Sequence, residues 1–277
     1  MINRAAEYVK QSKLSQTGAK KFTKHIQETA TWRDNCNVLD IGCGPGNVTY
    51  DYILPILPKC TNSIVAIDKR AYLVDYANER YGGKKSKIEF KHLDIVKDVT
   101  TLNQYANYFD HIFSFYCLQN ILDHETALKN IFKILKPGGD LYFLYDAHNN
   151  LYDVCEYLLR TPEWEPVLHD YKDSLYDYHD SATPKQDLEE LLVKVGFEHV
   201  YSTIENQEIL LPMETMTEFA IAQAPFDIPP ELERKFGLDG VDAVRTLKMN
   251  RFVEGREFCL SQFQELFGHH RKPIDAL

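Results

Sequence analysis

The sequence contains no hydrophobic run long enough to cross a membrane. A bilayer-spanning helix takes about 20 consecutive apolar residues, whereas the longest apolar runs of this 277-residue chain have the length of a strand. The N-terminal stretch MINRAAEYVKQSKLSQ also has no apolar core of the kind found in secretory signals. We therefore expect a protein without a membrane span, located in the cytoplasm.

Patterns that bind metals are also missing. The six cysteines are scattered with no C-x-x-C pair, and no H-E-x-x-H motif occurs. Cysteine and histidine pairs at these spacings are the usual sequence signs of a zinc site. The sequence therefore predicts free thiols and no protein-bound metal.

Positive charge is in deficit. Lysine and arginine number 31 against 41 aspartates and glutamates, which gives a formal net charge of −10. Proteins that bind nucleic acids usually carry a basic face that neutralises phosphates. The charge balance thus argues against a nucleic-acid partner, while a hydrophobic content of 44% is sufficient for a well-packed core.

Strand-like and helix-like segments alternate through the first half of the chain. This rhythm is typical of an α/β fold with a parallel, doubly wound sheet and right-handed crossovers. Helices are expected between the strands, at 48–57, 72–80 and 125–135. The predicted strands are 38–41, 63–67, 88–93, 109–116 and 140–145.

The alternation loosens in the second half, where 147–182 and 212–250 read as helical insertions. Long insertions that follow parallel strands lie at the carboxyl ends of the sheet, where α/β proteins bind their ligands. We therefore expect them to cover a substrate. The whole of 1–277 is predicted to be one domain. It would have a helical cap at 1–30, a cofactor-binding core at 31–146, and further core elements at 183–211 and 251–277. Within these last two parts we expect a helix at 188–195 and strands at 196–203 and 259–268.

Three glycines are concentrated after the first predicted strand, in VLDIGCGPGNVT at 38–49. Their spacing is G-x-G-x-G, not the G-x-G-x-x-G with which dinucleotide-binding proteins cradle a pyrophosphate. Asp40 precedes the loop and would meet a cationic ligand. Backbone N–H groups of such a loop can face a ligand directly, so the pattern predicts a site for a molecule that is not simply a phosphate.

Two more acids end the next two predicted strands. Asp68 stands where a carboxylate can accept hydrogen bonds from both ribose hydroxyls. Asp94 stands where a carboxylate can bind an adenine amine while Ile95 packs on the ring. Each acid alone is more often a cap or a turn residue. Three acids at the ends of three consecutive parallel strands, beside a glycine loop, favour a nucleoside joined to a charged amino acid.

The order of these motifs resembles the class I S-adenosylmethionine-dependent methyltransferases. V-L-D-I-G-C-G-P-G, the acid after the second strand, the D-I after the third, F-D-H-I-F-S-F and L-K-P-G-G follow one another as in that family. The resemblance implies a seven-stranded sheet with an antiparallel last strand, S-adenosyl-L-methionine as cofactor and S-adenosyl-L-homocysteine as product. It implies a cofactor site made of Asp40, Gly42, Cys43, Gly44, Asp68, Lys69, Asp94, Ile95 and Ser114.

A closer resemblance, to the arthropod juvenile hormone acid O-methyltransferases, covers nearly the whole chain. It is carried by FDHIFSFYCLQNI, NIFKILKPGGD, the TPEW segment and APFDIPPELERKF. Those enzymes methylate the carboxylate of farnesoic or juvenile hormone acid, so the resemblance implies a small apolar acid, isoprenoid or fatty, as substrate. Two positions depart from the family. Gln119-Asn120 stand where members have His-Trp, and a family glutamine falls nearest Ser15 or Gln16.

A carboxylate acceptor is already ionised near neutral pH, so it needs positioning more than a general base. The neutral side chains of Gln16, Tyr116, Gln119 and Asn120 are the candidates for that role. Two alternatives stay open: a methyltransferase of a hydroxyl or amine acceptor, in which a histidine could act as base, and a non-catalytic cofactor-binding relative. The aromatic residues of 150–182 either line an apolar pocket or pack the cover itself.

Overall fold

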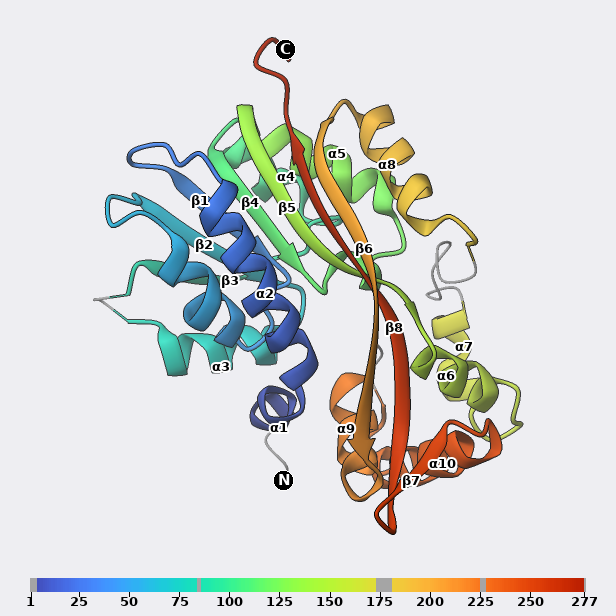
Figure 1. The fold of residues 1–277 in the computed structure, drawn as a ribbon. Helices are drawn as coiled ribbons and strands as arrows, with labels where there is room; N and C mark the ends of the chain where they lie inside the picture. Colours follow the sequence, from blue (N-terminus) through green and yellow to red (C-terminus); the bar gives the residue numbers. More distant parts are fainter. Residues whose placement is uncertain (1–3, 84–85, 173–180, 225–227, 277) are drawn as a thin grey trace.

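The centre of the fold is one mixed sheet in the order β3-β2-β1-β4-β5-β8-β6, with the short β7 paired to β8 (Figure 1). The computed structural model describes residues 4–83, 86–172, 181–224 and 228–276. β1 to β5 pair in parallel, and β8 runs antiparallel to both β5 and β6. The predicted doubly wound sheet with an antiparallel last strand is confirmed. The strands are β1 Asn37–Ile41, β2 Ser63–Asp68, β3 Ile88–His92, β4 Phe109–Phe115, β5 Leu135–Asn149, β6 Glu198–Pro212, β7 Asn250–Val253 and β8 Arg256–Arg271.

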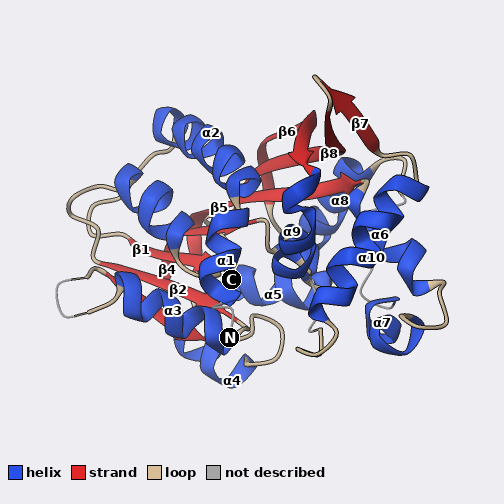
Figure 2. Cartoon of the chain, turned by 90° about the horizontal axis from the view of Figure 1, so that it is seen from below, coloured by secondary structure: helices blue, strands red, loops and turns tan. Residues whose placement is uncertain are grey.

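Helices cover both faces of this sheet (Figure 2). On one face, α2 and α3 pack against buried residues of β1, β2 and β4; on the other, α4, α5 and α8 do the same. The two apolar layers explain why the parallel strands read as near-continuous hydrophobic runs. The helices are α1 Arg4–Gln11, α2 Lys13–Thr29, α3 Ala71–Tyr81, α4 Val99–Leu102, α5 His124–Ile134, α6 Leu151–Leu159, α7 Glu165–Lys172, α8 Pro184–Val195, α9 Met216–Gln223 and α10 Glu233–Thr246.

The segment predicted as a helix at 48–57 is helical, but it is not a regular α-helix. It consists of a π-helical turn, η1 Thr49–Ile53, and a 3-10 turn, η2 Leu54–Ile56. Pro55 lacks the N–H that a regular α-helix would donate to the carbonyl four residues earlier, so the ladder is interrupted there. Three further 3-10 turns are η3 Asn103–Tyr105, η4 Leu118–Asn120 and η5 Met213–Thr215.

Three strands are longer than their sequence patterns predict. The apolar runs at 140–145, 196–203 and 259–268 belong to β5, β6 and β8, which have 15, 15 and 16 residues. β6 and β8 pair with each other from Glu198 and Arg271 to Pro212 and Phe258. Their outer halves extend beyond the parallel sheet as a ribbon, and their polar residues are kept in strand form by the partner strand's hydrogen bonds.

The predicted insertions form a separate layer at the carboxyl ends of the parallel strands, the lower end in Figure 1. We call α6, α7, α9 and α10, with β7 and the neighbouring ends of β6 and β8, the cover. It has its own buried apolar cluster. Trp164 is at its centre, with its ring edge-on to Phe236 and its Nε1 donating to Asp239 Oδ2 at 2.7 Å. Trp164 therefore packs the cover itself, whereas the side chains of Tyr171, Tyr176 and Tyr178 lie outside the described part.

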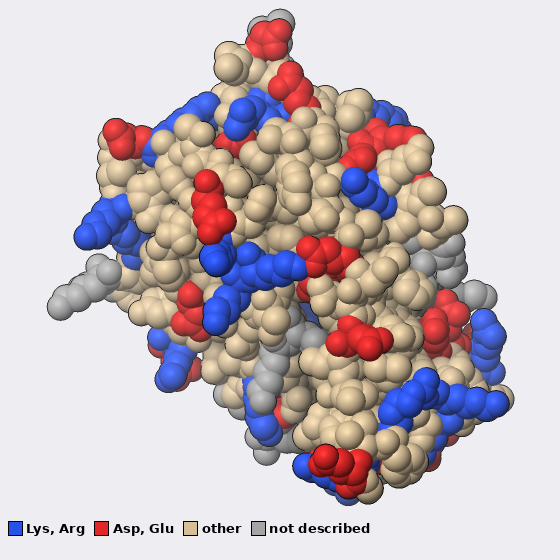
Figure 3. Space-filling view, viewed as in Figure 1, with Lys and Arg blue, Asp and Glu red and all other residues tan. Residues whose placement is uncertain are grey.

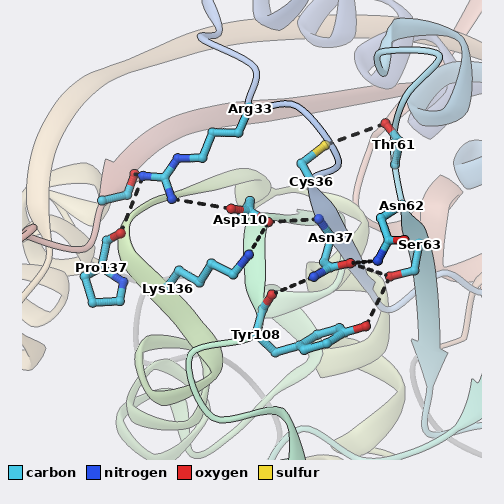
Figure 4. Close-up of polar contacts among 11 residues, drawn as sticks. Arg33, Cys36, Asn37, Thr61, Asn62, Ser63, Tyr108, Asp110, Lys136 and Pro137 are labelled. Carbon is cyan, nitrogen blue, oxygen red and sulfur yellow. Dashed lines mark hydrogen bonds and ion pairs between the residues drawn. The ribbon is translucent and has the colours of Figure 1, made fainter.

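The amino ends of the parallel strands are joined by a polar network around Asp110 (Figure 4). Its Oδ2 accepts hydrogen bonds from Lys136 Nζ at 2.7 Å and from the Asn37 backbone N–H at 2.9 Å, while Arg33 lies 3.4 Å from Oδ1. Burial works to raise the pKa of Asp110, but these donors outweigh it and hold the pKa below its usual value. β1, β4 and β5 are thus fastened at the edge opposite the cover.

On the face shown in Figure 3, basic side chains over α2 lie next to acidic ones over β6. Lys21 of α2 pairs with Glu205 of β6. Because both partners are partly exposed, such a pair contributes little to stability by itself. Within the described ranges, none of the helices has the length and apolar character to cross a membrane.

Two glycine substitutions test this packing. A Cβ on Gly268 of β8 would overlap the Phe143 ring, so Gly268→Ala is expected to lower the free energy of unfolding by about 1–3 kcal/mol. In α10, a Cβ on Gly240 would lie 3.8 Å from the Ala220 Cβ, which is an ordinary contact. Gly240→Ala should therefore raise the free energy of unfolding by roughly 0.5–1 kcal/mol. Urea unfolding measures both. Equal stability of Gly268→Ala and the parent would contradict the placement of Phe143 against β8.

Candidate functional site

The glycine loop is held between the ends of β1 and β2. The backbone N–H groups of Gly42 and Cys43 both donate to the Ile67 carbonyl, at 2.8 and 3.0 Å. Gly42, Gly44 and Gly46 have φ values of +76°, +54° and +82°, which favour glycine. The chain therefore turns sharply away from β1 and brings its backbone to the carboxyl edge of the sheet.

The three glycines are needed for different reasons. A Cβ on Gly42 would overlap Cys117, and one on Gly46 would lie 2.8 Å from the Phe90 ring, so these two make room for the protein's own packing. At Gly44 the nearest atom, on the Tyr8 ring, would be 4.0 Å away. Gly44 is thus the glycine that leaves space for a ligand.

Asp68 fastens the loop. Its Oδ2 accepts a hydrogen bond from the Gly44 N–H at 2.9 Å, and its Oδ1 accepts one from the Arg70 N–H at 2.8 Å. Burial raises the pKa of Asp68 and the two N–H donors act against that rise. Each carboxylate oxygen has a second lone pair, so the predicted ribose-binding group can still accept hydrogen bonds from a ligand.

Asp40 is a buried acid at the base of the loop. It is 2% exposed, and its Oδ2 accepts a hydrogen bond from Thr49 Oγ1 at 2.6 Å. Burial is the main cause that raises its pKa to about 7, and the charge of Asp68 adds to the shift. A cationic ligand nearby would stabilise the ionised form, which agrees with the charge predicted for the ligand.

The other predicted adenine and ribose neighbours also have roles within the fold. Asp94 Oδ1 accepts hydrogen bonds from the N–H groups of Val96 at 2.8 Å and Lys97 at 3.4 Å, so it caps the turn after β3. Ile95 is 4% exposed and belongs to the apolar layer under α4 and α5. Neither contact shows an adenine site, and their adenine-binding role remains a prediction.

Lys69 and Ser114 connect the site to its surroundings. Lys69 Nζ donates to the Asn120 carbonyl of η4 at 3.4 Å. Ser114 is fully buried in β4 and its Oγ donates to the Ile41 carbonyl at 3.3 Å, which ties β4 to β1 below the loop. Lys69 is therefore on the ligand edge of the sheet, and Ser114 supports it from within.

Three of the four predicted acceptor-positioning residues follow β4 directly. Tyr116 has a φ of +51° and donates its hydroxyl proton to Glu265. Gln119 is 6% exposed, and its Oε1 has no hydrogen-bond partner among the described residues. Asn120 is exposed and donates from Nδ2 to the Tyr116 carbonyl at 3.4 Å. A buried amide with an unused oxygen is the sort of group a substrate could satisfy.

Gln16 lies on α2, and its Nε2 donates to the Val9 carbonyl at 3.2 Å and to Ser12 Oγ at 2.9 Å. It therefore fastens the turn between α1 and α2. The same helix reaches Tyr116, because a Cβ on Gly18 would overlap the Tyr116 hydroxyl. The structure thus places the N-terminal half of α2 against the end of β4.

Two residues near the loop had no signal in the sequence. Tyr8 of α1 faces Gly44; burial raises its pKa to about 12, and the charges of Arg70 and Asp68 lie close to it. Arg70 Nη2 donates to the Ala224 carbonyl at the end of α9, at 3.4 Å. The N-terminal helix and the cover therefore meet over the loop, a juxtaposition of segments far apart in the chain.

Two buried acids were also missed, Asp146 on β5 and Glu265 on β8. An acid inside LYFLYD and inside QELF is an uncommon residue in a buried strand, and that signal could have identified them. Among the described residues, no three of His, Cys, Asp and Glu are arranged to hold a metal ion.

A sequence model described as a methyltransferase domain matches residues 39–143, from β1 to β5, the stretch that holds the loop, Asp68 and Asp94. This chain is an S-adenosylmethionine-dependent methyltransferase. The structure fits that cofactor: the space at Gly44 and the buried acid Asp40 suit a cationic nucleoside derivative.

The methyltransferase is similar over most of its length to two insect enzymes. It is 29% identical to juvenile hormone acid O-methyltransferase of Bombyx mori, over 90% of this chain and 88% of that protein. It is also 29% identical to the Drosophila melanogaster enzyme of that name, over 98% and 93%. Phosphoethanolamine N-methyltransferase 2 of Haemonchus contortus, solved with S-adenosylhomocysteine, shares the fold, with a TM-score of 0.51 and 16% identity over 91% of this chain and 53% of that one.

The pKa of Asp40 gives a stability test for the cofactor-free protein. Because its folded pKa is raised from 3.8 to about 7, its protonation stabilises the fold at low pH, and this contribution is lost as the pH rises to about 7. Between pH 5 and pH 8 the methyltransferase should lose about 3 kcal/mol relative to Asp40→Asn, which does not titrate. Urea unfolding at both pH values measures the difference, with the exposed Asp75→Asn as control. A constant difference between Asp40→Asn and the parent would contradict a buried, neutral Asp40.

Proposed function

We propose that this methyltransferase transfers the methyl group of S-adenosylmethionine to the carboxylate of a small apolar acid, isoprenoid or fatty. The observation that carries the proposal is the extent of the similarity to the two juvenile hormone acid O-methyltransferases, 90% and 98% of the chain. The methyltransferase domain itself spans only 39–143. The likeness therefore includes the cover, where an acceptor would be bound.

The chemical character of the cover supports an apolar acceptor. Its helices surround a buried cluster that includes three methionines, Met213, Met216 and Met249, beside Val154 and Leu158. Methionine side chains adapt to irregular apolar shapes. A cover of this composition at the ligand edge suits a hydrocarbon chain better than a charged or sugar-like one.

The proposed cofactor contacts are those that the family resemblance implies, and the geometry at Gly44 and Asp68 supports them. Asp40, Gly42, Cys43 and Gly44 would hold the methionine part, Asp68 the ribose, and Asp94 with Ile95 the adenine, with Lys69 and Ser114 supporting the edge. When bound, the cofactor supplies a methyl group activated by a sulfonium. Tyr8 and Arg70, from two sides of the loop, would exclude water from it.

The protein's part in the transfer is to orient the acceptor. A carboxylate is ionised near neutral pH, so no base has to remove a proton from it. Gln119 brings a buried amide to the end of β4, where its Nε2 is the atom that could donate to a carboxylate, and Tyr116 and Asn120 lie in the same segment. Correct orientation of the attacking oxygen is worth several kcal/mol in such a displacement.

One departure from the family favours a second candidate, transfer to a hydroxyl or an amine. Gln119-Asn120 occupy the place of the family's His-Trp, so the acceptor end of the site differs from that of the relatives. Buried His124 lies next to this segment, with its Nε2 2.9 Å from the Leu118 carbonyl. A non-catalytic relative is the third possibility, and the test below separates all three.

The acceptor can be tested with three matched compounds. With radiolabelled S-adenosylmethionine, we expect farnesoic acid to yield a base-labile methyl ester, and farnesol and farnesylamine to yield no labelled product. Label in farnesol or farnesylamine alone would contradict the carboxylate assignment. Binding of S-adenosylhomocysteine without turnover of any of the three would indicate a non-catalytic relative.

Asp68→Ala tests the cofactor site separately. Loss of the carboxylate removes its ribose contacts and frees Gly44, so the affinity for S-adenosylhomocysteine should fall by about 10- to 100-fold. Isothermal titration calorimetry measures this. The control is Asp75→Ala, an exposed acid of α3, with the melting temperature of each free protein as a check on folding. Equal affinities for the two variants would remove Asp68 from the site.

A further inference from the structure

Asp146 and Glu265 face each other across β5 and β8. They are register partners in the antiparallel pair and are 8% and 4% exposed. Side chains directly opposite in such a pair have Cβ atoms about 5 Å apart. Alternation along the strands puts them on the same face as Leu144 and Phe267, which pack under α2. Two carboxyl groups are therefore buried side by side beneath α2.

This pair lies next to the reacting end of the site. Tyr116, which donates to Glu265, follows β4 directly, and the next residue, Cys117, packs against Gly42 of the glycine loop. On the other side, Gly18 of α2 leaves space for the Tyr116 hydroxyl and the Glu265 carboxylate. The acids thus lie between the cofactor loop, α2 and the carboxyl end of β5, where β5 continues into the cover.

The two acids have different surroundings. Burial raises the pKa of Glu265, while the hydrogen bond from the Tyr116 hydroxyl and the charge of Lys21 act against that rise and Glu205 adds to it. Asp146 faces the Glu265 carboxylate, and no lysine or arginine of the described residues acts on its pKa. Burial, reinforced by Glu265, raises the pKa of Asp146 to about 7. Two neighbouring buried carboxylates repel each other when both are ionised. Of the two, Glu265 has a hydroxyl donor and a lysine that favour its ionised form, so the proton is assigned to Asp146.

The proton on Asp146 can be placed at one atom. Asn149 Nδ2 donates to Asp146 Oδ2 at 2.8 Å, so Oδ2 acts as acceptor. Oδ1 has no hydrogen-bond partner among the described residues although it is buried. A protonated Oδ1 is then an O–H donor without an acceptor, and leaving such a group unpaired costs about 1–3 kcal/mol.

We propose that the Asp146 carboxyl donates a hydrogen bond from Oδ1 to the acceptor carboxylate and so holds it beside the methyl donor, with Glu265 keeping Asp146 neutral. This inference rests on the proposed function. The acceptor's other oxygen forms the new C–O bond as the C–S bond breaks and its electron pair returns to sulfur. The products are a neutral ester and a neutral thioether, and Asp146 retains its proton throughout.

The test is the pH dependence of kcat/KM for farnesoic acid at saturating S-adenosylmethionine, from pH 6 to pH 9. For the parent enzyme, kcat/KM should be level up to about pH 7 and then fall about tenfold per pH unit, because ionised Asp146 neither donates nor tolerates an anion. Asp146→Asn keeps a donor at every pH, so its profile should stay level to pH 9. Asp146→Ala should raise KM below about pH 7, where the parent carries the O–H donor.

Two further variants complete the design. Glu265→Gln removes the charge that favours the protonated Asp146, so kcat/KM should begin to fall at a lower pH than in the parent. This variant tests the inference if Asp146→Asn does not fold. Asp140→Asn is the matched control at the opposite end of β5, where Asp140 bonds His269 and Arg271 at 2.8 Å. It should lower the melting temperature and leave the pH profile of the parent unchanged.

The outcomes separate this inference from the proposed function. A parent enzyme that binds S-adenosylhomocysteine but methylates no acid at any pH overturns the proposed function. A parent enzyme that methylates farnesoic acid, with the same alkaline fall retained in Asp146→Asn, overturns the role of Asp146 alone. A level profile in Asp146→Asn beside a falling one in the parent supports it.

Discussion

The site depends on the carboxylate of Asp68. It joins the end of β2 to the glycine loop through Gly44 and to the start of α3 through Arg70, with hydrogen bonds of 2.9 and 2.8 Å. A loop with three glycines can adopt many conformations in the unfolded chain. The two hydrogen bonds of Asp68 favour the single conformation that the folded loop has. The protein's own hydrogen bonds thereby hold the loop at the carboxyl edge of the sheet.

The rest of the site is built around this edge by segments that are distant in sequence. Tyr8 comes from α1, Arg70 reaches the end of α9, and Tyr116 bonds Glu265 on the last strand. The antiparallel β8 makes this possible, because it pairs with both β5 and β6 and carries its residues from the cover back through the sheet. The glycine loop is thus local to β1 and β2, whereas the segments around it come from the whole length of the chain.

Much of the core could be predicted because its signals are local. Val38–Ile41 followed by glycines, and Ile134–Leu135 followed by Lys136-Pro-Gly-Gly, mark strand and helix ends by backbone chemistry alone. The interrupted helix around Pro55 also had a local signal, which its apolar spacing concealed. The full lengths of β6 and β8 had none, since Glu198 to Pro212 is largely exposed and becomes a strand only through its partner. Asp94 matched a family position, yet its neighbours in the turn use it as a cap.

By itself the sequence determined the doubly wound core, the glycine turn and the acids at the strand ends, because strand periodicity, backbone freedom and chain order are properties of short segments. Only the tertiary structure brought Asp146 and Glu265 together. The two acids are separated by more than a hundred positions in the chain, and the sequence does not pair them. The pKa of Asp146 depends on its burial and on the Glu265 charge across a strand pair, and both exist only once β5 and β8 lie side by side.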